Sequence, residues 1–224
     1  MINHDLKCIF VEVPKTGSSS IRSIVGCPEK AHRSIIEIKN QITEQQFDEY
    51  FKFGYVRNPW DRAVSLYNRI CNKRKRIVEG RSKNTLNRDH EFIISQILRD
   101  VDYSPPMIIN KYTNLTQDIP FNDFIKLHKY ATDTCFHPTQ KKYQLDFLTN
   151  SSGQVIVDFI GRFENLDQDF NIVCDKIGIP QQTLPHKNKS THKHYTEYYD
   201  DKSRRIIMNR FDKDIEYFGY KFGD

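Results

Sequence analysis

Three short apolar runs stand out along the chain. They lie at residues 6–13 (LKCIFVEV), 53–57 and 155–160 (VIVDFI), and their lengths are typical of strands buried in a sheet. Apolar residues at helical spacing predict helices at 21–25, 60–71, 121–125 and 166–177, with another over 201–218. This alternation favours one α/β domain over residues 1–224, with a mainly parallel central sheet flanked by helices.

Start and stop signals bound most of these helices. Asn58 is followed by Pro59, the order expected for an N-cap and the first helical position. Thr43 to Gln46 reads as a capping box that opens a short helix carrying Phe47 and Phe51. The remaining signals are Gly26 and Gly178 as helix ends, and Asp89 and either Asp200 or Asp201 as helix starts.

The composition suits a globular chain of this kind. Of 224 residues, 38% are hydrophobic and 12% aromatic, which is enough to build the core of one domain and argues against a wholly disordered chain. No stretch approaches the roughly 20 apolar residues needed to cross a bilayer. Residues 1–7 lack the apolar centre of a secretory signal, so we expect a cytoplasmic protein without a membrane span.

The charge balance and the cysteines further restrict the class of protein to which the chain can belong. Lys and Arg number 34 against 29 Asp and Glu, a formal charge of +5, which suits an anionic ligand but does not by itself indicate nucleic acid. Much of the excess lies in residues 73–88, where Glu79 is the only acid. The five cysteines are widely spaced without a Cys-x-x-Cys pair, so neither a disulfide framework nor a structural metal site is expected.

The first strand and the first helix are joined by a loop of small polar residues, Pro14-Lys15-Thr16-Gly17-Ser18-Ser19-Ser20. A glycine at this place lets backbone N–H groups converge on an anion at the helix N-terminus, and Lys15 adds a positive charge. The loop is not a Walker A motif, because its lysine precedes its only glycine. The pattern therefore indicates phosphate binding of another kind, with a plain serine-rich turn as the alternative.

A second motif follows the second strand: Arg57-Asn58-Pro59-Trp60-Asp61-Arg62-Ala63-Val64-Ser65. Arg57 ends the strand, and Ser65 lies about two turns into the next helix. Both can face the cleft beyond the strand ends, where open α/β sheets bind their ligands. A guanidinium fork beside a hydroxyl suits a second, separate phosphate.

Together the two motifs resemble those of sulfotransferases that use 3′-phosphoadenosine 5′-phosphosulfate (PAPS), in particular the carbohydrate branch, sulfotransferase family 2-like and Golgi-type. The loop is similar to the family's Pro-Lys-Thr-Gly-Gly-Thr-Ser, and the second motif to its Arg-[Asn/Asp]-Pro-x-x-Arg-x-x-Ser. The resemblance spans nearly the whole chain and is weakest between about residues 72 and 134. Further matches lie at Gly161–Leu166, Asn188–Ser190, Tyr195 and Phe218–Tyr220.

The resemblance implies a P-loop-like sulfotransferase fold and a PAPS donor that leaves as PAP, with no metal. It assigns the 5′-phosphosulfate to the loop residues Lys15, Thr16, Gly17, Ser18, Ser19 and Ser20, with Lys15 neutralising the charge on the leaving PAP. It assigns the 3′-phosphate to Arg57 and Ser65. Lys189 and Ser190, in the long polar loop 181–199, are expected near the same phosphate. One departure is Ser18, which stands where the family usually has a second glycine and carries strain if that position needs a positive φ.

The acceptor hydroxyl needs a base, and histidine is the commonest one near neutral pH. His32 lies between the two motifs, where some carbohydrate sulfotransferases carry their catalytic histidine, and it is our candidate base. Its alternative is a histidine in a solvent-facing loop. His137 and Glu164 are the other candidates, although Arg162 or a helix N-terminus can simply pair with Glu164.

The sequence leaves the acceptor and the oligomeric state open. A carbohydrate hydroxyl is the expected acceptor, and the basic residues 73–88 either bind an acidic glycan or form the solvated end of a helix. Tyrosyl, phenolic, lipid and small-alcohol acceptors are the alternatives within the same chemistry. The alternative from another class is a polyanion-binding module that uses the loop only to dock an anion. No specific nucleic-acid partner is expected.

Overall fold

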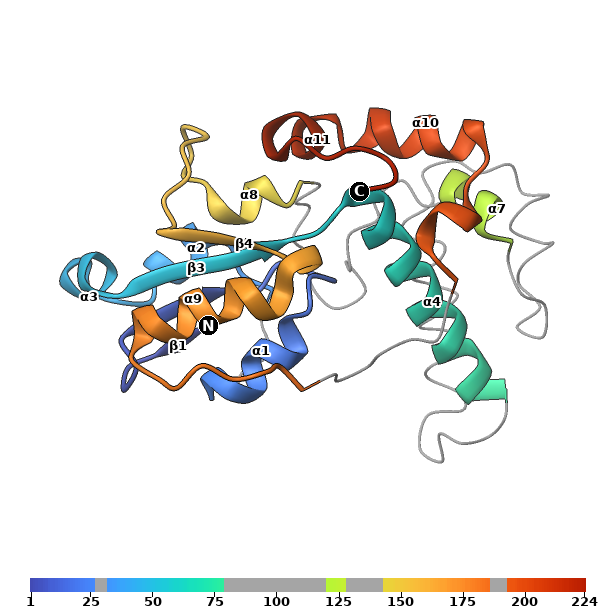
Figure 1. Ribbon diagram of the computed structural model, residues 1–224. Coiled ribbons are helices and arrows are strands. Elements are labelled where there is room, and N and C mark those ends of the chain that lie inside the picture. The colour runs from blue at the N-terminus through green and yellow to red at the C-terminus, as the bar shows by residue number, and fades with distance from the viewer. Residues whose placement is uncertain (27–31, 79–119, 128–142, 186–192) are drawn as a thin grey trace.

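A four-stranded sheet forms the centre of the molecule in a computed structural model that describes residues 1–26, 32–78, 120–127, 143–185 and 193–224. The strands are β1 (Ile2–Asn3), β2 (Cys8–Val11), β3 (Phe51–Val56) and β4 (Phe159–Arg162), in the order β1-β2-β3-β4. The short β1 is antiparallel to β2, whereas β2, β3 and β4 are parallel (Figure 1). The α/β class with a mainly parallel sheet is therefore confirmed.

Helices join and cover the strands. They are α1 (Ser18–Val25), α2 (Ile35–Lys39), α3 (Glu44–Glu49), α4 (Pro59–Val78), α7 (Phe121–Leu127), α8 (Leu145–Leu148), α9 (Leu166–Ile177), α10 (Asp201–Arg210) and α11 (Asp212–Phe218). Two 3₁₀ turns, η1 (Phe163–Asn165) and η2 (Tyr195–Tyr198), complete the described elements. None of the helices in the described ranges is both long and apolar enough to cross a membrane.

The two faces of the sheet are covered by different helices. Because side chains alternate along a strand, Ile9 and Val11 of β2 face a core that α2, α4 and α8 share. Cys8 and Phe10 face the opposite core, which α1 and α9 close. Figure 1 shows α1 and α9 on one side of the sheet and α8 on the other. Along the chain, α1 follows β2 and α4 follows β3, so both helices begin at the carboxyl ends of these strands.

A group of helices extends the first core away from the sheet. The helices α4, α7 and α10 contact one another, and η2 lies against α4 (Figure 1). Aromatic rings fill the space between them: Phe121 lies edge-on to Tyr67, Tyr198 and Tyr199, with ring centroids 4.8 to 5.4 Å apart. This packing fixes α4 against α7 and the η2 region.

Several predicted boundaries shift in the structure. The run 6–13 forms only the four-residue strand β2, and only the last two residues of the run 155–160 belong to β4. Val155 instead forms an isolated bridge with Thr149, and the register with β3 begins at Phe159, next to the hydrogen bond from the Asp158 amide to the Lys52 carbonyl. Phe51 is not on a helix; it is the first residue of β3, where its register opposite Cys8 fixes it.

The predicted C-terminal helix is in fact two helices. Phe211 has φ −118° and ψ 30°, which ends α10, and its buried ring anchors the corner before α11. The sequence reasoning also missed β1, α2 and α8, all of five residues or fewer. The helix predicted after Asp89 lies outside the described residues.

The predicted capping signals are mostly confirmed. The Thr43 side chain accepts a hydrogen bond from the Gln46 amide, and the Gln46 side chain accepts one from the Thr43 amide, as in a capping box. Gly26 and Gly178 end α1 and α9 in the left-handed conformation. Asp200, rather than Asp201, caps α10.

Candidate functional site

The loop between β2 and α1 is held in an unusual backbone conformation. Lys15 has φ 69° and Gly17 has φ 82°, both in the left-handed region. The buried Thr16 hydroxyl donates to the Val13 carbonyl at 2.9 Å, and the Ser20 amide donates to the Gly17 carbonyl at 3.0 Å. No side chain in the described part of the chain caps the start of α1. The Ser18 and Ser19 N–H groups at the start of α1 therefore point out of the helix, where an anion can accept from them.

Ser18, which stands where the sulfotransferase motif usually has a second glycine, carries no backbone strain. Ser18 is the first residue of α1 and has a negative φ, so the position does not need glycine. The residue that adopts the strained conformation is Lys15, which the sequence reasoning did not anticipate.

Gly17 is needed for a second reason besides its φ. A β-carbon at this position would lie 3.0 Å from Leu166 Cδ2 and 3.2 Å from Phe163 Cδ2. Phe163 and Leu166 belong to η1 and α9, which follow β4. The predicted phosphate loop, residues 14–20, therefore lies directly on the segment that follows β4, the third parallel strand.

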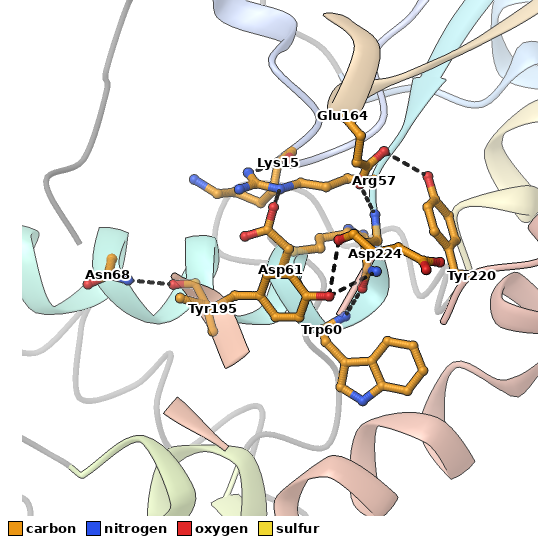
Figure 2. Close-up of polar contacts among 12 residues, drawn as sticks. Lys15, Arg57, Trp60, Asp61, Asn68, Glu164, Tyr195, Tyr220 and Asp224 are labelled. Carbon is orange, nitrogen blue, oxygen red and sulfur yellow. Dashed lines mark hydrogen bonds and ion pairs between the residues drawn. The ribbon is translucent and has the colours of Figure 1, made fainter. Parts of the chain in front are cut away.

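Arg57 reaches from the end of β3 to this loop. Its Nη1 group donates to the Lys15 carbonyl at 3.3 Å, and its Nε group donates to Asp61 Oδ2 at 2.7 Å (Figure 2). The guanidinium carbon lies 3.8 Å from the centre of the Phe163 ring. These contacts leave Nη2 without an acceptor among the described residues, so this edge of the guanidinium suits an anion.

The two predicted phosphate sites therefore lie side by side. Lys15 and Arg57, 42 residues apart in the sequence, are joined by one hydrogen bond. Ser65 lies on α4 and is half-buried. Lys189 and Ser190 lie outside the described residues, as does His137. The basic stretch 73–88 begins at the end of α4, and its part after Val78 also lies outside them.

The start of α4, just after Arg57, is fixed by buried polar contacts. Asn58 caps the helix through Oδ1, which accepts from the Trp60 amide at 3.1 Å, and its Nδ2 donates to the Lys221 carbonyl at 2.9 Å. Glu164 accepts from the Asn58 amide at 2.6 Å and from the Tyr220 hydroxyl at 3.3 Å (Figure 2). Burial and the charge of Glu164 raise the pKa of Tyr220, so its hydroxyl stays a donor. These contacts support the alternative in which Glu164 pairs with a helix N-terminus.

His32 is buried, at 4% exposure, so the alternative of a solvent-facing histidine is wrong. Its Nδ1 lies 2.9 Å from the Glu12 carbonyl. A carbonyl can only accept, so Nδ1 carries the proton, and in the neutral ring Nε2 is the basic nitrogen. Glu12 directly follows β2, three residues before Lys15. The hydrogen bond thus ties the candidate base to the strand that leads into the phosphate loop.

Three buried residues that the sequence reasoning did not select hold the backbone of this site in place. Arg62 donates from Nε to the Pro14 carbonyl at 3.0 Å. Gln144 and Asp214, both 0% exposed, connect the Arg57 backbone to α11. Burial raises the pKa of Asp214, while the charge of Arg62 and hydrogen bonds from backbone amides act in the opposite direction. Within the described ranges, no group of three or more His, Cys, Asp or Glu side chains could hold a metal ion.

A mainly parallel sheet, a lysine-bearing loop at the N-terminus of α1 and an arginine after the next strand define an α/β protein with two cationic residues beyond the strand ends, where such folds bind their ligands. The sequence profile of the sulfotransferase family matches residues 1–221. The chain belongs to this family and is a sulfotransferase.

Relatives support the assignment at low identity. A carbohydrate sulfotransferase 10 from Xenopus laevis is 22% identical over 257 residues, and the one from Homo sapiens is 23% identical over 259. These alignments cover 96% and 97% of this chain but only 65% of each relative. An uncharacterized protein of Archaeoglobus fulgidus is 28% identical over 170 residues, covering 76% of this chain and 96% of that protein. No solved structure matches the chain.

Proposed function

We propose that the chain, acting as one domain over residues 1–224, transfers the sulfuryl group of PAPS to a hydroxyl of a carbohydrate. The observation that carries the proposal is the hydrogen bond between Arg57 and the Lys15 carbonyl, which sets two anion-binding groups next to each other. PAPS carries phosphate groups at both ends of its ribose, so a donor of this kind needs two such groups at short distance.

The residues of the site fit this donor. The start of α1 and the hydroxyls of Ser18, Ser19 and Ser20 are the expected partners of the 5′-phosphosulfate. The Thr16 hydroxyl already donates to the Val13 carbonyl, so Thr16 is expected to contribute through its backbone. The Nη edge of Arg57, with Ser65 on α4, is the expected partner of the 3′-phosphate. When bound, PAPS supplies the sulfuryl group and the PAP leaving group.

Catalysis then rests on positioning and charge. His32 Nε2 accepts the proton of the acceptor hydroxyl as that oxygen forms its bond to sulfur, and the Glu12 carbonyl keeps the ring in the required tautomer. Lys15 stabilises the negative charge that grows on the PAP oxygen as its bond to sulfur breaks. The arrangement resembles phosphoryl transfer, where little covalent chemistry is asked of the protein.

The carbohydrate acceptor is supported by the relatives named carbohydrate sulfotransferase 10, which align along nearly the whole chain. A direct test is incubation with labelled PAPS and a panel of neutral glycans, acidic glycans, phenols and tyrosyl peptides, with products mapped by mass spectrometry. Sulfation of a glycan is expected. Sulfation of phenols or peptides alone contradicts the acceptor, and no product from any acceptor contradicts the reaction.

Variants test the donor site separately. R57A should weaken PAP binding roughly 10–100-fold, the scale of lost charge-assisted hydrogen bonds. It should weaken AMP binding less, through the loss of the hydrogen bond that holds the Lys15 carbonyl. K15A should abolish transfer. The exposed residues Arg205 and Lys176 offer matched controls. R205A and K176A should change neither the PAP affinity nor the rate of transfer. Equal loss of PAP and AMP affinity in R57A contradicts the 3′-phosphate assignment.

The base has its own test. H32A should lower turnover roughly 10²–10⁴-fold, the usual contribution of a general base, while PAP affinity stays close to that of the wild type. Calorimetry with PAP and single-turnover assays separate the two quantities. A large loss of PAP affinity in H32A, with proportionate loss of turnover, contradicts the role of base.

A further inference from the structure

The side chain of Gln144 forms hydrogen bonds with both backbone groups of Arg57, an arrangement called the Gln144 clamp below. Its Oε1 accepts from the Arg57 amide at 2.9 Å, and its Nε2 donates to the Arg57 carbonyl at 2.9 Å. Arg57 directly follows β3, so the amide side chain takes the place of a neighbouring strand at the point where the sheet pairing stops. Both backbone groups of the arginine are thereby satisfied, and its backbone is fixed.

The clamp is itself anchored. Asp214 on α11 accepts from the Gln144 amide at 2.9 Å and from the Leu145 amide at 3.1 Å. The charge of Arg62 acts on Asp214 and opposes the effect of burial on its pKa. Arg62 in turn holds the Pro14 carbonyl, one residue before Lys15. Gln144, Asp214 and Arg62 thus form a buried polar chain between Arg57 and the loop, with hydrogen bonds at its two ends and the electrostatic interaction of Arg62 with Asp214 between them.

The members of this chain are shielded from any nucleotide. Arg62 is 1% exposed, and Gln144 and Asp214 are 0% exposed. Their side chains are directed at backbone atoms of Pro14, Arg57, Gln144 and Leu145. If a substitution at one of these three residues changes nucleotide affinity, it must therefore do so by changing the position of Arg57 or of the loop.

We propose that Gln144, anchored by Asp214, is a positioning residue that sets the distance between the 3′-phosphate site and the 5′-phosphosulfate loop. The inference rests on the proposed function, in which Arg57 binds the 3′-phosphate. The two phosphates of one nucleotide are separated by a fixed covalent frame, so both can be bound well only if the two sites keep that separation. The clamp thus determines how much the 3′-phosphate adds to affinity.

The test compares the affinities for PAP and AMP, which differ in the 3′-phosphate. Q144M removes both hydrogen bonds at nearly constant side-chain volume. It should lower the ratio of the AMP to the PAP dissociation constant by roughly tenfold, since the arginine loses its fixed position. Q144E keeps an acceptor for the Arg57 amide and, when protonated, a donor for its carbonyl. Its ratio should lie between those of Q144M and the wild type.

A matched control separates positioning from general stability. Thr149 lies in the same segment, is 6% exposed and donates from Oγ1 to the Leu145 carbonyl at 3.1 Å. T149V should lower the thermal midpoint without changing the ratio of the AMP to the PAP dissociation constant. An unchanged ratio in folded Q144M, or an equal change in T149V, overturns the inference. If Q144M does not fold, Q144E decides: a ratio equal to that of the wild type across pH 5–8 overturns it.

The failure of this inference differs from the failure of the proposed function. If wild-type protein binds AMP as tightly as PAP, or if R57A keeps the preference for PAP, Arg57 does not bind the 3′-phosphate and both ideas fall. If R57A loses the preference and Q144M keeps it, only the role of Gln144 is wrong.

Discussion

The left-handed backbone at Lys15 concentrates strain at one residue of the site. A non-glycine residue in this region costs of order 1–3 kcal/mol and persists only where neighbours hold it. Here the neighbours are the Arg57 guanidinium on the Lys15 carbonyl and the Thr16 hydroxyl on the Val13 carbonyl. The strain and its restraints turn the carbonyl of Lys15 toward Arg57, so the loop is shaped before a ligand arrives.

Gly17 gives a test of that shape. G17A places a β-carbon at φ 82° and 3.0 Å from Leu166 Cδ2, so the loop must shift. The left-handed backbone alone costs roughly 1–2 kcal/mol in the free energy of unfolding. We expect G17A to show at least this loss, measured by urea denaturation, together with a clear loss of PAP affinity.

Gly178 provides the matched control for Gly17. It has φ 72° and ends α9, and none of the described residues lies within 4 Å of the place that a β-carbon would take there. G178A therefore carries the backbone cost without a clash. It should lose stability to a similar or smaller extent and keep the PAP affinity of the wild type. Equal PAP affinities in G17A and G178A contradict the tight seating of the loop.

Individual site residues could be predicted from the sequence where they belong to a local motif. Lys15 and Arg57 carry charge at the ends of predicted strands, and the structure joins them by a hydrogen bond. Gln144 could not be selected, because its role depends on two partners, 87 and 70 residues away, that no local pattern connects. Arg62 lies inside a motif, but only its hydrogen bond to the Pro14 carbonyl shows that it supports the loop.

At the scale of elements, the start of α4 connects the site to the last residues of the chain. Asn58 caps the helix with its oxygen and holds the Lys221 carbonyl with its nitrogen. Gly223 donates to the Tyr195 hydroxyl at 2.6 Å, which brings η2 into the same cluster. The chain end labelled C in Figure 1 therefore lies beside the helix that follows Arg57.

The double role of Asn58 predicts an asymmetry between two similar substitutions. N58D keeps a good cap but replaces the donor to the Lys221 carbonyl by an acceptor, in a place that is 0% exposed. An unsatisfied buried group of this kind costs about 1–3 kcal/mol, so the free energy of unfolding should fall by that amount in urea denaturation.

The control is the reverse exchange at another helix start. Asp200 caps α10 at an exposed position through the Ser203 amide, and D200N offers an equivalent cap. It should change the free energy of unfolding by less than about 0.5 kcal/mol, as surface substitutions usually do. Similar losses in N58D and D200N contradict the role of the Asn58 nitrogen.

Element types followed from the local pattern, but several boundaries did not. Phe47 and Phe51 have helical spacing, yet Phe51 pairs in register with Cys8 on a distant strand. Tyr50 leaves the helical conformation to allow it, with φ −81° and ψ 137°. Strand ends are set by the partner strand, which a single segment of sequence does not contain.

At the scale of the whole molecule, the sheet separates two cores that meet the site from opposite sides. One core, under α1 and α9, supports the phosphate loop through Phe163 and Leu166. The other reaches α11, whose Asp214 supports Gln144. The alternation of strands and helices predicted the layers. It did not predict that α11 would support the end of β3, because this connection depends on one buried polar residue, Gln144.

That buried carboxylate makes global stability depend on pH in a defined direction. Burial raises the pKa of Asp214 above its usual 3.8, against the opposing charge of Arg62, and the neighbouring Tyr220 also interacts with it. Between 3.8 and the raised value, the folded state binds more protons at this site than the unfolded state does. This site therefore contributes stability that increases as the pH falls through that window and is lost as the pH rises.

Subtraction of D214N isolates this contribution, because the other groups titrate in both proteins. The free energy of unfolding of the wild type minus that of D214N, from urea denaturation between about pH 7 and pH 4, should become more positive as the pH falls. D214N also loses one acceptor for the Gln144 and Leu145 amides. This loss shifts the difference in unfolding free energy by a constant amount at every pH and leaves its slope against pH unchanged. A difference that grows as the pH rises is the pattern of a lowered pKa, and it means that Arg62 and the amide donors outweigh burial at the anchor of the Gln144 clamp.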